Sequence, residues 1–502
     1  MKKKAKIITY MFFLTVFIVV FFLAIYLKTK FKNVTTEQMI YSLIYPKGTS
    51  FDSMKDGIIY VSIRTIIVLL IIYILHLIIK KYKYKPYIIY KLNKKTKKIN
   101  ILEMTKLKKT IILIIVIIVS LFSMVKALKV DKYIEMQKNS SSIFENYYIN
   151  PKNTKIEFPK EKQNLIYIFV ESLEMTNSSQ KNGGLFAKSL IPNLETIAMK
   201  NINFSNGNKL GGAYNISGAS WTAASLIAQT SGIPLKLQID TSGYSGYKES
   251  LPGAYSIGEI LNKNGYKNYL MIGSDANFGR RKDYFIQHGD YKIMDYYYAK
   301  EHGWIPENYH VWWGFEDKKL YEFAKQELSS ISKNKEPFNF TLLTADTHFE
   351  NGYTDISCPY NYDNPYANSI NCTDIMLGDF INWIKKQEFY ENTTIIITGD
   401  HLTMQSDFYD EILPEDYKRT IYNVIINSRE EAKTNKNREF TLLDMYPTTL
   451  SSLGVNIDGN KLGLGVNLYS KEKTLVEKIG YKELDSEISK KSLYYETEIL
   501  KK

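Results

Sequence analysis

Cysteine and histidine are scarce in this sequence, with two and six residues among 502. The two cysteines, Cys358 and Cys372, have 13 residues between them, which fits no common pattern of zinc ligands, so a zinc site built on them is not expected. Low-complexity segments and internal repeats are also absent. With 45% hydrophobic and 23% charged residues, the composition excludes a disordered chain, and the length excludes a peptide hormone, a small disulfide scaffold or a lone binding module.

Acidic residues are nearly absent from the first quarter of the chain. Residues 1–129 hold 24 Lys and Arg but only 4 Asp and Glu, whereas the remainder holds 41 basic and 48 acidic residues. The formal net charge of +13 therefore arises in the N-terminal quarter, beside long apolar runs, where it can pair with anionic lipid. For this reason no nucleic-acid partner is expected.

Three long apolar runs lie in this quarter. They cover residues 7–27, without a charge, residues 58–79, interrupted by Arg64 and His76, and residues 110–125, extendable to 128 if Lys126 snorkels. A helix crosses a bilayer with about 20 apolar residues, so the sequence predicts transmembrane helices at about 7–27, 58–79 and 108–128, within a membrane anchor of residues 1–128. A cleaved signal peptide is the alternative for the first run, but no small-x-small cleavage site follows it.

The lysines predict how this anchor is oriented. Residues 80–109 hold 12 Lys and a single acid, Glu103, and four further lysines precede the first run, whereas residues 28–57 are nearly balanced, with 5 Lys and 3 acids. Because cytoplasmic loops carry the excess of Lys and Arg, everything after about residue 129 is expected outside. In an oxidising outer compartment Cys358 and Cys372 are expected to form a disulfide, and two unpaired buried thiols are the alternative. Arg64 is expected to snorkel or to face another helix.

The pattern of apolar and polar segments after residue 129 is typical of an α/β fold. Residues 129–160 are predicted to be a polar connector with a short helix near 130–136, residues 161–475 a folded domain and residues 476–502 a polar tail. Short, continuous apolar runs are typical of strands buried on both faces, and they lie at 165–170, 268–272, 338–343, 393–398 and 424–426. Helices are expected between them, at 255–264, 318–330 and 377–387. This alternation predicts a mostly parallel central sheet with helices on both faces.

Polar residues follow two of the predicted strands directly. Glu171 follows the first strand, and Asp400 and His401 follow the fourth. Between them a Gly/Ser-rich segment places Thr222 before an apolar stretch, as at a helix N-terminus, where anions are favoured. Ligands of such sheets bind beyond the carboxyl ends of the strands, which is where these residues lie. Two carboxylates and an imidazole suit a divalent cation, and such a cation could activate the threonine hydroxyl. The alternative is that these are solvated loop residues.

The outer region resembles the membrane-anchored phosphoglycerol and phosphoethanolamine transferases of the alkaline phosphatase/sulfatase superfamily, which include lipoteichoic acid synthases. It is most similar to the phosphoglycerol transferases of osmoregulated periplasmic glucans. The matching segments are YIFVESLE (167–174), SWTAASLIAQTSGIPL (220–235), NYLMIGSDANF (268–278), TLLTADTHFENGY (341–353) and TGDHLTM (398–404). This resemblance implies an alkaline phosphatase/sulfatase-like fold and a multi-pass protein of the bacterial cytoplasmic (inner) membrane, with its catalytic domain on the periplasmic or extracytoplasmic side.

The resemblance also implies a role for individual residues. Thr222 would be the nucleophile and, together with Glu171, Asp400 and His401, would hold a divalent metal ion; Mn²⁺ or Mg²⁺ is expected, with Zn²⁺ as the alternative. His348 would bind the phosphate or serve the leaving and entering alcohols. A basic side chain that binds the phosphate is also implied, and Arg280, Arg281 and Lys282 are the candidates for it. Cys358 and Cys372 match the paired cysteines of the glucan-modifying branch, which implies a disulfide. Trp221, next to the threonine, is expected either to line the lipid pocket or only to pack in the core.

The function implied is transfer of phosphoglycerol from phosphatidylglycerol to a glycan, through a covalent intermediate on the threonine. Transfer of phosphoethanolamine to lipid A or a glycan is the alternative donor chemistry. A sulfatase that depends on formylglycine is disfavoured, because Cys358-Pro359 lacks the spacing and the arginine of that motif. A non-catalytic scaffold or glycan sensor is the rival from another class, but no expected metal ligand is missing.

Overall fold

The structure is a computed structural model that describes residues 2–31, 34–44, 51–82, 87–92, 95–100, 105–236 and 249–500. The chain divides into two compact units. The helical unit comprises Met1–Thr36 and Thr49–Ile134, and the α/β unit comprises Glu37–Gly48 and Glu135–Lys502.

Three long helices make up most of the helical unit. These are α1 (Lys2–Lys30), α3 (Phe51–Tyr82) and α4 (Lys106–Ala127), and each is long and apolar enough to cross a membrane. Helix α1 packs against both α3 and α4, and the Ser120 hydroxyl donates a hydrogen bond of 2.7 Å to the Phe17 carbonyl. Many of their leucine and isoleucine side chains remain exposed, as a lipid environment requires. All three predicted apolar helices are therefore present in the structure.

The structure adds two details of this unit, the environment of Arg64 and a hairpin between two of the helices. Arg64 faces outward on α3, with its guanidinium carbon 3.5 Å from the centre of the Tyr60 ring, so it contacts its own helix rather than another one. The lysine-rich segment between α3 and α4 contains an antiparallel hairpin, β1 (Tyr87–Leu92) and β2 (Lys95–Asn100), that the sequence did not predict.

A six-stranded sheet forms the centre of the α/β unit. Its order is β6-β5-β7-β4-β8-β9, and all neighbouring pairs are parallel except the antiparallel pair of β8 and β9. The strands are β4 (Asn164–Val170), β5 (Lys267–Ile272), β6 (Lys292–Met294), β7 (Phe338–Leu343), β8 (Thr393–Gly399) and β9 (Asn423–Ile426). Five of them coincide with the predicted strands, and the predicted mostly parallel α/β fold is confirmed.

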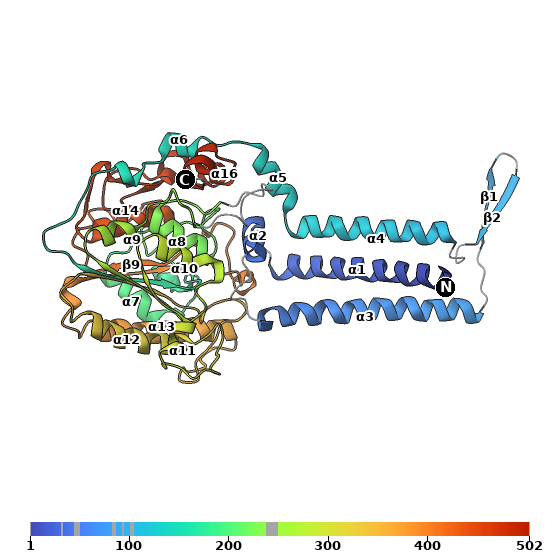
Figure 1. Cartoon of the computed structure of the whole chain (residues 1–502), viewed down its shortest axis with the longest axis horizontal. Coiled ribbons are helices and arrows are strands. Elements are labelled where there is room, and N and C mark those ends of the chain that lie inside the picture. The colour runs from blue at the N-terminus through green and yellow to red at the C-terminus, as the bar shows by residue number, and fades with distance from the viewer. Residues whose placement is uncertain are drawn as a thin grey trace. The chain divides into compact units, whose positions relative to one another are not determined.

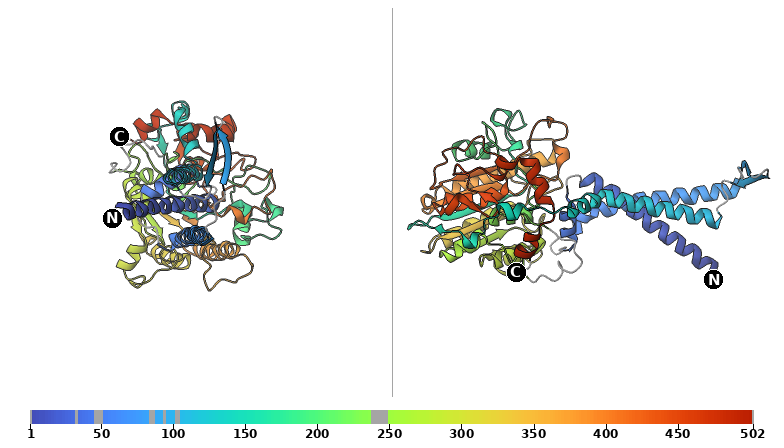
Figure 2. Two further views of the ribbon diagram at one scale, coloured as in Figure 1. Left: turned by 90° about the vertical axis from the view of Figure 1, so that its right-hand side faces the viewer. Right: turned by 90° about the horizontal axis from the view of Figure 1, so that it is seen from above.

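Helices cover both faces of this sheet (Figure 1, Figure 2). Alternate residues of β4 enter two separate hydrophobic clusters: Leu165, Tyr167 and Phe169 on one face, Ile166, Ile168 and Val170 on the other. The first face is covered by α8 (Thr222–Ser231), α9 (Ile257–Lys263), α10 (Arg281–Gln287) and α14 (Met445–Ser452). The second is covered by α7 (Pro192–Lys200), α11 (Tyr296–Glu301), α12 (Asp317–Ile331) and α13 (Pro365–Ile384). Burial on both faces explains why the strands read as continuous apolar runs.

Segments far from the sheet in sequence complete its core. The predicted connector contains α5 (Val130–Lys138), α6 (Ile143–Tyr147) and β3 (Ile156–Glu157), which pairs with β10 (Asn456–Ile457). The segment expected to be a polar tail instead forms α15 (Leu475–Ile479), α16 (Tyr481–Ser489) and a π-helical turn (Tyr495–Ile499). Its apolar side chains are buried in the cluster on the α8 side, among them Leu484, Ile488, Tyr495 and Ile499. Hydrophobic burial, rather than charge content, decides the conformation of this segment.

Candidate metal centre and nucleophile

The residues after β4 and β8 meet because these strands are paired neighbours. Val170 lies opposite Gly399 in the register, so the next residues of both strands, Glu171 and Asp400, emerge at the same edge of the sheet. Oδ1 of Asp400 accepts hydrogen bonds from the backbone N–H groups of Ser172, at 2.8 Å, and His401, at 2.7 Å. Ser172 takes a left-handed φ of 55°, which turns the chain sharply after the strand. The turn and the paired register fix the carboxylates side by side.

Thr222 is brought to the same place by α8. It is the first residue of that helix, and its Oγ1 lies 3.2 Å from Oε2 of Glu171 and 3.3 Å from Nε2 of His401. Two later residues of α8 hold the helix against β8: the Ser225 hydroxyl donates to the Asp400 carbonyl, and Nε2 of Gln229 donates to the Gly399 carbonyl at 3.2 Å. Residues from three distant parts of the chain therefore converge on one hydroxyl group.

Glu171, Asp400 and His401 together fit a divalent cation. Each is buried and offers one ligand atom, and these atoms all lie within 4.8 Å of one another. Nδ1 of His401 donates to the Leu402 carbonyl at 2.8 Å, so Nε2 is the nitrogen that faces the carboxylates and would coordinate a cation. Oδ2 of Asp400 accepts no hydrogen bond from any residue that the structure describes, although it is fully buried. A buried carboxylate oxygen without a hydrogen-bond donor suits a metal ligand.

The charges of this cluster are strongly perturbed. Burial and the neighbouring Glu171 raise the pKa of Asp400 to about 7. For Glu171, burial works in the opposite direction to the imidazoles of His401 and His348, and the imidazoles hold its pKa below its usual range. The two carboxylates likewise outweigh burial at His401 and raise its pKa to about 10. The site thus favours added positive charge, as a proton or as a cation.

Of the three candidates for the phosphate-binding side chain, Arg281 is the buried one. Its side chain is 7% exposed, and it donates from Nε to the Phe278 carbonyl at 2.9 Å and from Nη2 to the Asp275 carbonyl at 2.7 Å. Burial lowers its pKa to about 10, opposed by the charges of Asp275 and Glu171. Arg280 instead pairs with Asp283 at 3.0 Å, and Lys282 is exposed.

His348 lies in the loop that follows β7, with its ring centre 4.6 Å from the Trp313 ring. Its Nδ1 donates to the Phe349 carbonyl at 2.6 Å, and burial lowers its pKa, so the neutral imidazole is favoured. Trp221, the residue before the threonine, is 6% exposed, and its indole nitrogen has no hydrogen-bond partner among the described residues.

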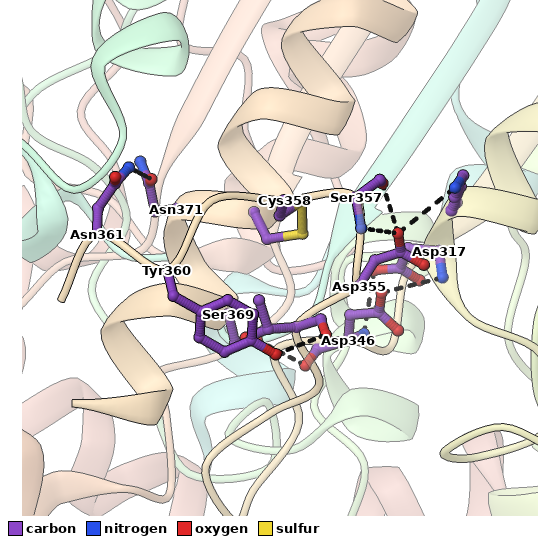
Figure 3. The surroundings of a disulfide bond; sticks show 12 residues. Asp317, Asp346, Asp355, Ser357, Cys358, Tyr360, Asn361, Ser369 and Asn371 are labelled. Atoms are coloured by element: carbon purple, nitrogen blue, oxygen red, sulfur yellow. Dashed lines mark hydrogen bonds and ion pairs between the residues drawn. A yellow bond between two sulfur atoms is a disulfide. The ribbon is translucent and has the colours of Figure 1, made fainter. Parts of the chain in front are cut away.

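The predicted disulfide is present between Cys358 and Cys372. It joins the loop after β7 to helix α13, and Figure 3 shows it beside the carboxylates of Asp317, Asp346 and Asp355. Asp317 accepts hydrogen bonds from the N–H groups of Ala345, at 2.8 Å, and Asp346, at 3.0 Å, and Asp346 accepts one from the N–H group of Asp317, at 3.1 Å. These reciprocal bonds tie the start of α12 to the loop after β7.

The residues that the sequence singled out as metal ligands and nucleophile lie together in the structure, whereas the residues that support them were not predicted. Ser225 and Gln229 are read as part of an apolar helical stretch, and their contacts with β8 depend on how that helix packs. Tyr41, which contacts this region from α2 (Thr36–Ile44), lies in a segment that carries no motif.

Comparison with known proteins was made for the whole chain. A family model described as Sulfatase matches residues 163–455. Phosphoglycerol transferase I of Xanthomonas axonopodis pv. citri is 29% identical over 257 residues, which is 50% of this chain and 35% of that protein. Phosphoglycerol transferase I of Shigella flexneri is 28% identical over 355 residues, which is 67% of this chain and 44% of that protein. The chain therefore spans less than half the length of these relatives.

Among solved structures, the integral membrane lipooligosaccharide phosphoethanolamine transferase A of Neisseria meningitidis has a TM-score of 0.51 at 14% identity. The match covers 95% of this chain and 87% of that one. At this identity the likeness is one of fold.

Proposed function

The chain belongs to the sulfatase family, and from this premise we propose that it is a membrane-bound, metal-dependent transferase that moves phosphoglycerol from phosphatidylglycerol to a glycan. The observation that carries the proposal is the hydroxyl of Thr222 at 3.2 Å from Glu171 and 3.3 Å from His401, in a cluster that fits a cation. The phosphoglycerol group is taken from the relatives at 28–29% identity, whereas the phosphoethanolamine transferase supports the fold alone.

The residues suggest a transfer in two steps. Oγ1 of Thr222 attacks phosphorus, an O–P bond forms, and the bond from phosphorus to the diacylglycerol oxygen breaks. A hydroxyl of the acceptor then attacks the phosphoglyceryl-threonine and restores the threonine. A cation held by Glu171, Asp400, His401 and Thr222 would lower the pKa of the threonine hydroxyl and offset charge on the phosphate oxygens.

Two further residues have roles in this scheme. Arg281 would bind an equatorial phosphate oxygen, since its guanidinium lies close enough to Glu171 for the two charges to interact. His348 is held as a neutral imidazole, so it would first accept the proton of the Thr222 hydroxyl and then pass that proton to the leaving diacylglycerol oxygen. In the second step it would take the proton of the entering alcohol and return it to Oγ1 of Thr222.

The three apolar helices make this a membrane protein, and we place the α/β unit on the outer side of the membrane. The lysine-rich segment between α3 and α4 and the lysines before α1 would then face the cytoplasm. This orientation puts the site on the same side of the membrane as the outer leaflet, where the lipid donor is presented.

Replacing Thr222 by alanine is the direct test. The full chain is incubated in detergent micelles with Mn²⁺ and labelled phosphatidylglycerol, and released diacylglycerol is measured. Thr222→Ala should lower this release roughly a thousandfold or more, because the attacking oxygen is lost, whereas Thr222→Ser should retain part of it. Thr497→Ala, at an exposed threonine, is the matched control.

Mass spectrometry adds the identity of the transferred group. A phosphoglycerol adduct on the peptide with Thr222 supports the proposal, and an adduct formed only from phosphatidylethanolamine would replace phosphoglycerol by phosphoethanolamine. Undiminished diacylglycerol release by Thr222→Ala would refute the nucleophile.

A further inference from the structure

Part of α2 belongs to the α/β unit, although the sequence places this helix between the two apolar helices α1 and α3. Tyr41 of α2 is 6% exposed and is a member of the hydrophobic cluster on the α8 side. Its ring centre lies 6.4 Å from that of Trp221, the residue before the threonine, and Nε2 of Gln38 lies 3.5 Å from Sδ of Met404 in the loop after β8. The loop between two membrane helices thus supplies a wall of the candidate site.

Tyr41 contacts a backbone turn at Gly279 and Arg280. Its hydroxyl donates a hydrogen bond of 2.7 Å to the carbonyl of Gly279. Gly279 and Arg280 both take left-handed backbone conformations, with φ of 62° and 53°. A Cβ on Gly279 would lie 3.1 Å from Cβ of Ala223 and 3.6 Å from the ring of Tyr41. The turn is therefore held between the helix of the candidate nucleophile and the tyrosine.

This turn leads directly into Arg281. Nε and Nη2 of Arg281 are bonded within the segment 274–278, whereas Nη1 has no hydrogen-bond acceptor in the part of the chain that the structure describes. Tyr41, Gly279, Arg281 and Ala223 line the same small pocket, which has room for about one water molecule. A guanidinium fixed at two nitrogens and open at the third is prepared to bind an anion.

We propose that Tyr41 is a positioning residue, which holds the turn at Gly279 so that Arg281 presents Nη1 to the phosphodiester anion of the donor. The proposal rests on the proposed function, because it takes Arg281 as the phosphate-binding residue. It makes the loop between the first two apolar helices part of the reaction site rather than only a connection. Removing the phenol leaves Thr222 and the cation ligands in place and loosens the arginine.

Binding of inorganic phosphate by the full chain in detergent, loaded with Mn²⁺, tests this inference without turnover. Tyr41→Ala should weaken phosphate binding about tenfold, the size of one lost charge-assisted hydrogen bond. Tyr41→Phe, which keeps the ring but loses the bond to Gly279, should lie between wild type and Tyr41→Ala. Ser42→Ala, an exposed residue of the same helix, is the matched control and should bind as wild type.

The decisive comparison is with Arg281→Ala. If Tyr41 acts through the arginine, Tyr41→Ala should add nothing to the loss that Arg281→Ala causes, because the effects of coupled residues are not additive. Independent, multiplied losses, or wild-type binding by Tyr41→Ala, would overturn the proposal, as would the absence of phosphate binding by the wild-type chain. Tyr41→Phe decides the matter if Tyr41→Ala does not fold. Diacylglycerol release by the wild type is measured separately, so a failure of the proposed function is seen independently.

Discussion

The two carboxylate oxygens of Asp400 have different surroundings. Its Oδ1 accepts two backbone hydrogen bonds that shape the turn, whereas its buried Oδ2 accepts no hydrogen bond from the described residues and has only the imidazole of His401 as an ion-pair partner there, at 3.4 Å. The carboxylate is therefore costly to the fold without a cation and useful for binding one.

Asp400→Asn should accordingly move two measurements in opposite directions. Mn²⁺ affinity, measured by titration calorimetry, should fall by more than about a hundredfold, because an anionic ligand is lost. At pH 8 the thermal midpoint of the metal-free protein should rise, because burial and Glu171 raise the pKa of Asp400 to about 7 and the ionised carboxylate is destabilising there. The exposed residue Asp407 provides the control, Asp407→Asn. Unchanged Mn²⁺ affinity would exclude Asp400 as a ligand.

The central residues could be found from sequence because the chemistry follows the strands directly. Glu171, Asp400 and His401 each stand within two residues of a buried strand, and Thr222 opens a helix. The choice among Arg280, Arg281 and Lys282 could not be made, since it depends on the left-handed turn at Gly279. Tyr41 could not be found at all, because its contact with that turn joins segments distant in sequence.

Between whole elements, the link from α12 to the loop after β7 rests on two acids. The backbone hydrogen bonds of Asp317 and Asp346 are reciprocal, and both side chains are buried. Burial and the charges of neighbouring acids raise the pKa of Asp317 to about 7, and burial and the charge of Asp317 raise that of Asp346 well above its usual value. One proton on the pair removes their repulsion.

This pair predicts a pH dependence of stability. Both pKa values are raised on folding, so the pair stabilises fully below about pH 4, and this contribution is lost as the pH rises through about 7. Asp346→Asn, a mimic of the protonated acid, should flatten the fall in the free energy of unfolding as the pH rises above about 4. Denaturant unfolding at several pH values measures it, with the exposed Asp363→Asn as control. An unaltered slope in Asp346→Asn would contradict the shared proton.

Strands could be predicted from the sequence where they are buried along their whole length, because they then appear as continuous apolar runs. The strands β4, β7 and β8 are buried along their whole length, so they read as apolar runs. Strand β6 has three residues, of which Lys292 is exposed, and gives no such run. Helix α13 starts at Pro365, earlier than expected, because the Asn364 side chain caps it and its many polar residues are buried against neighbouring elements. These burials depend on tertiary contacts that periodicity does not show.

At the scale of the whole molecule, the proposed orientation can be tested with single cysteines. Ser330→Cys, at an exposed position of α12, should react in intact cells with a membrane-impermeant maleimide, whereas Lys6→Cys, near the start of α1, should react only after permeabilisation. The native cysteines are joined in the disulfide and give little background. The reverse pattern of labelling would place the α/β unit in the cytoplasm and end the proposed function.

The core of the α/β unit has one more consequence, for biogenesis. Tyr41 and Leu500 belong to the same hydrophobic cluster, so the earliest and latest parts of this unit to leave the ribosome are needed to close it. In the proposed orientation this unit would cross the membrane before its cluster closes, and until its last helices arrive the apolar faces of α8 and α14 stay uncovered by these C-terminal partners.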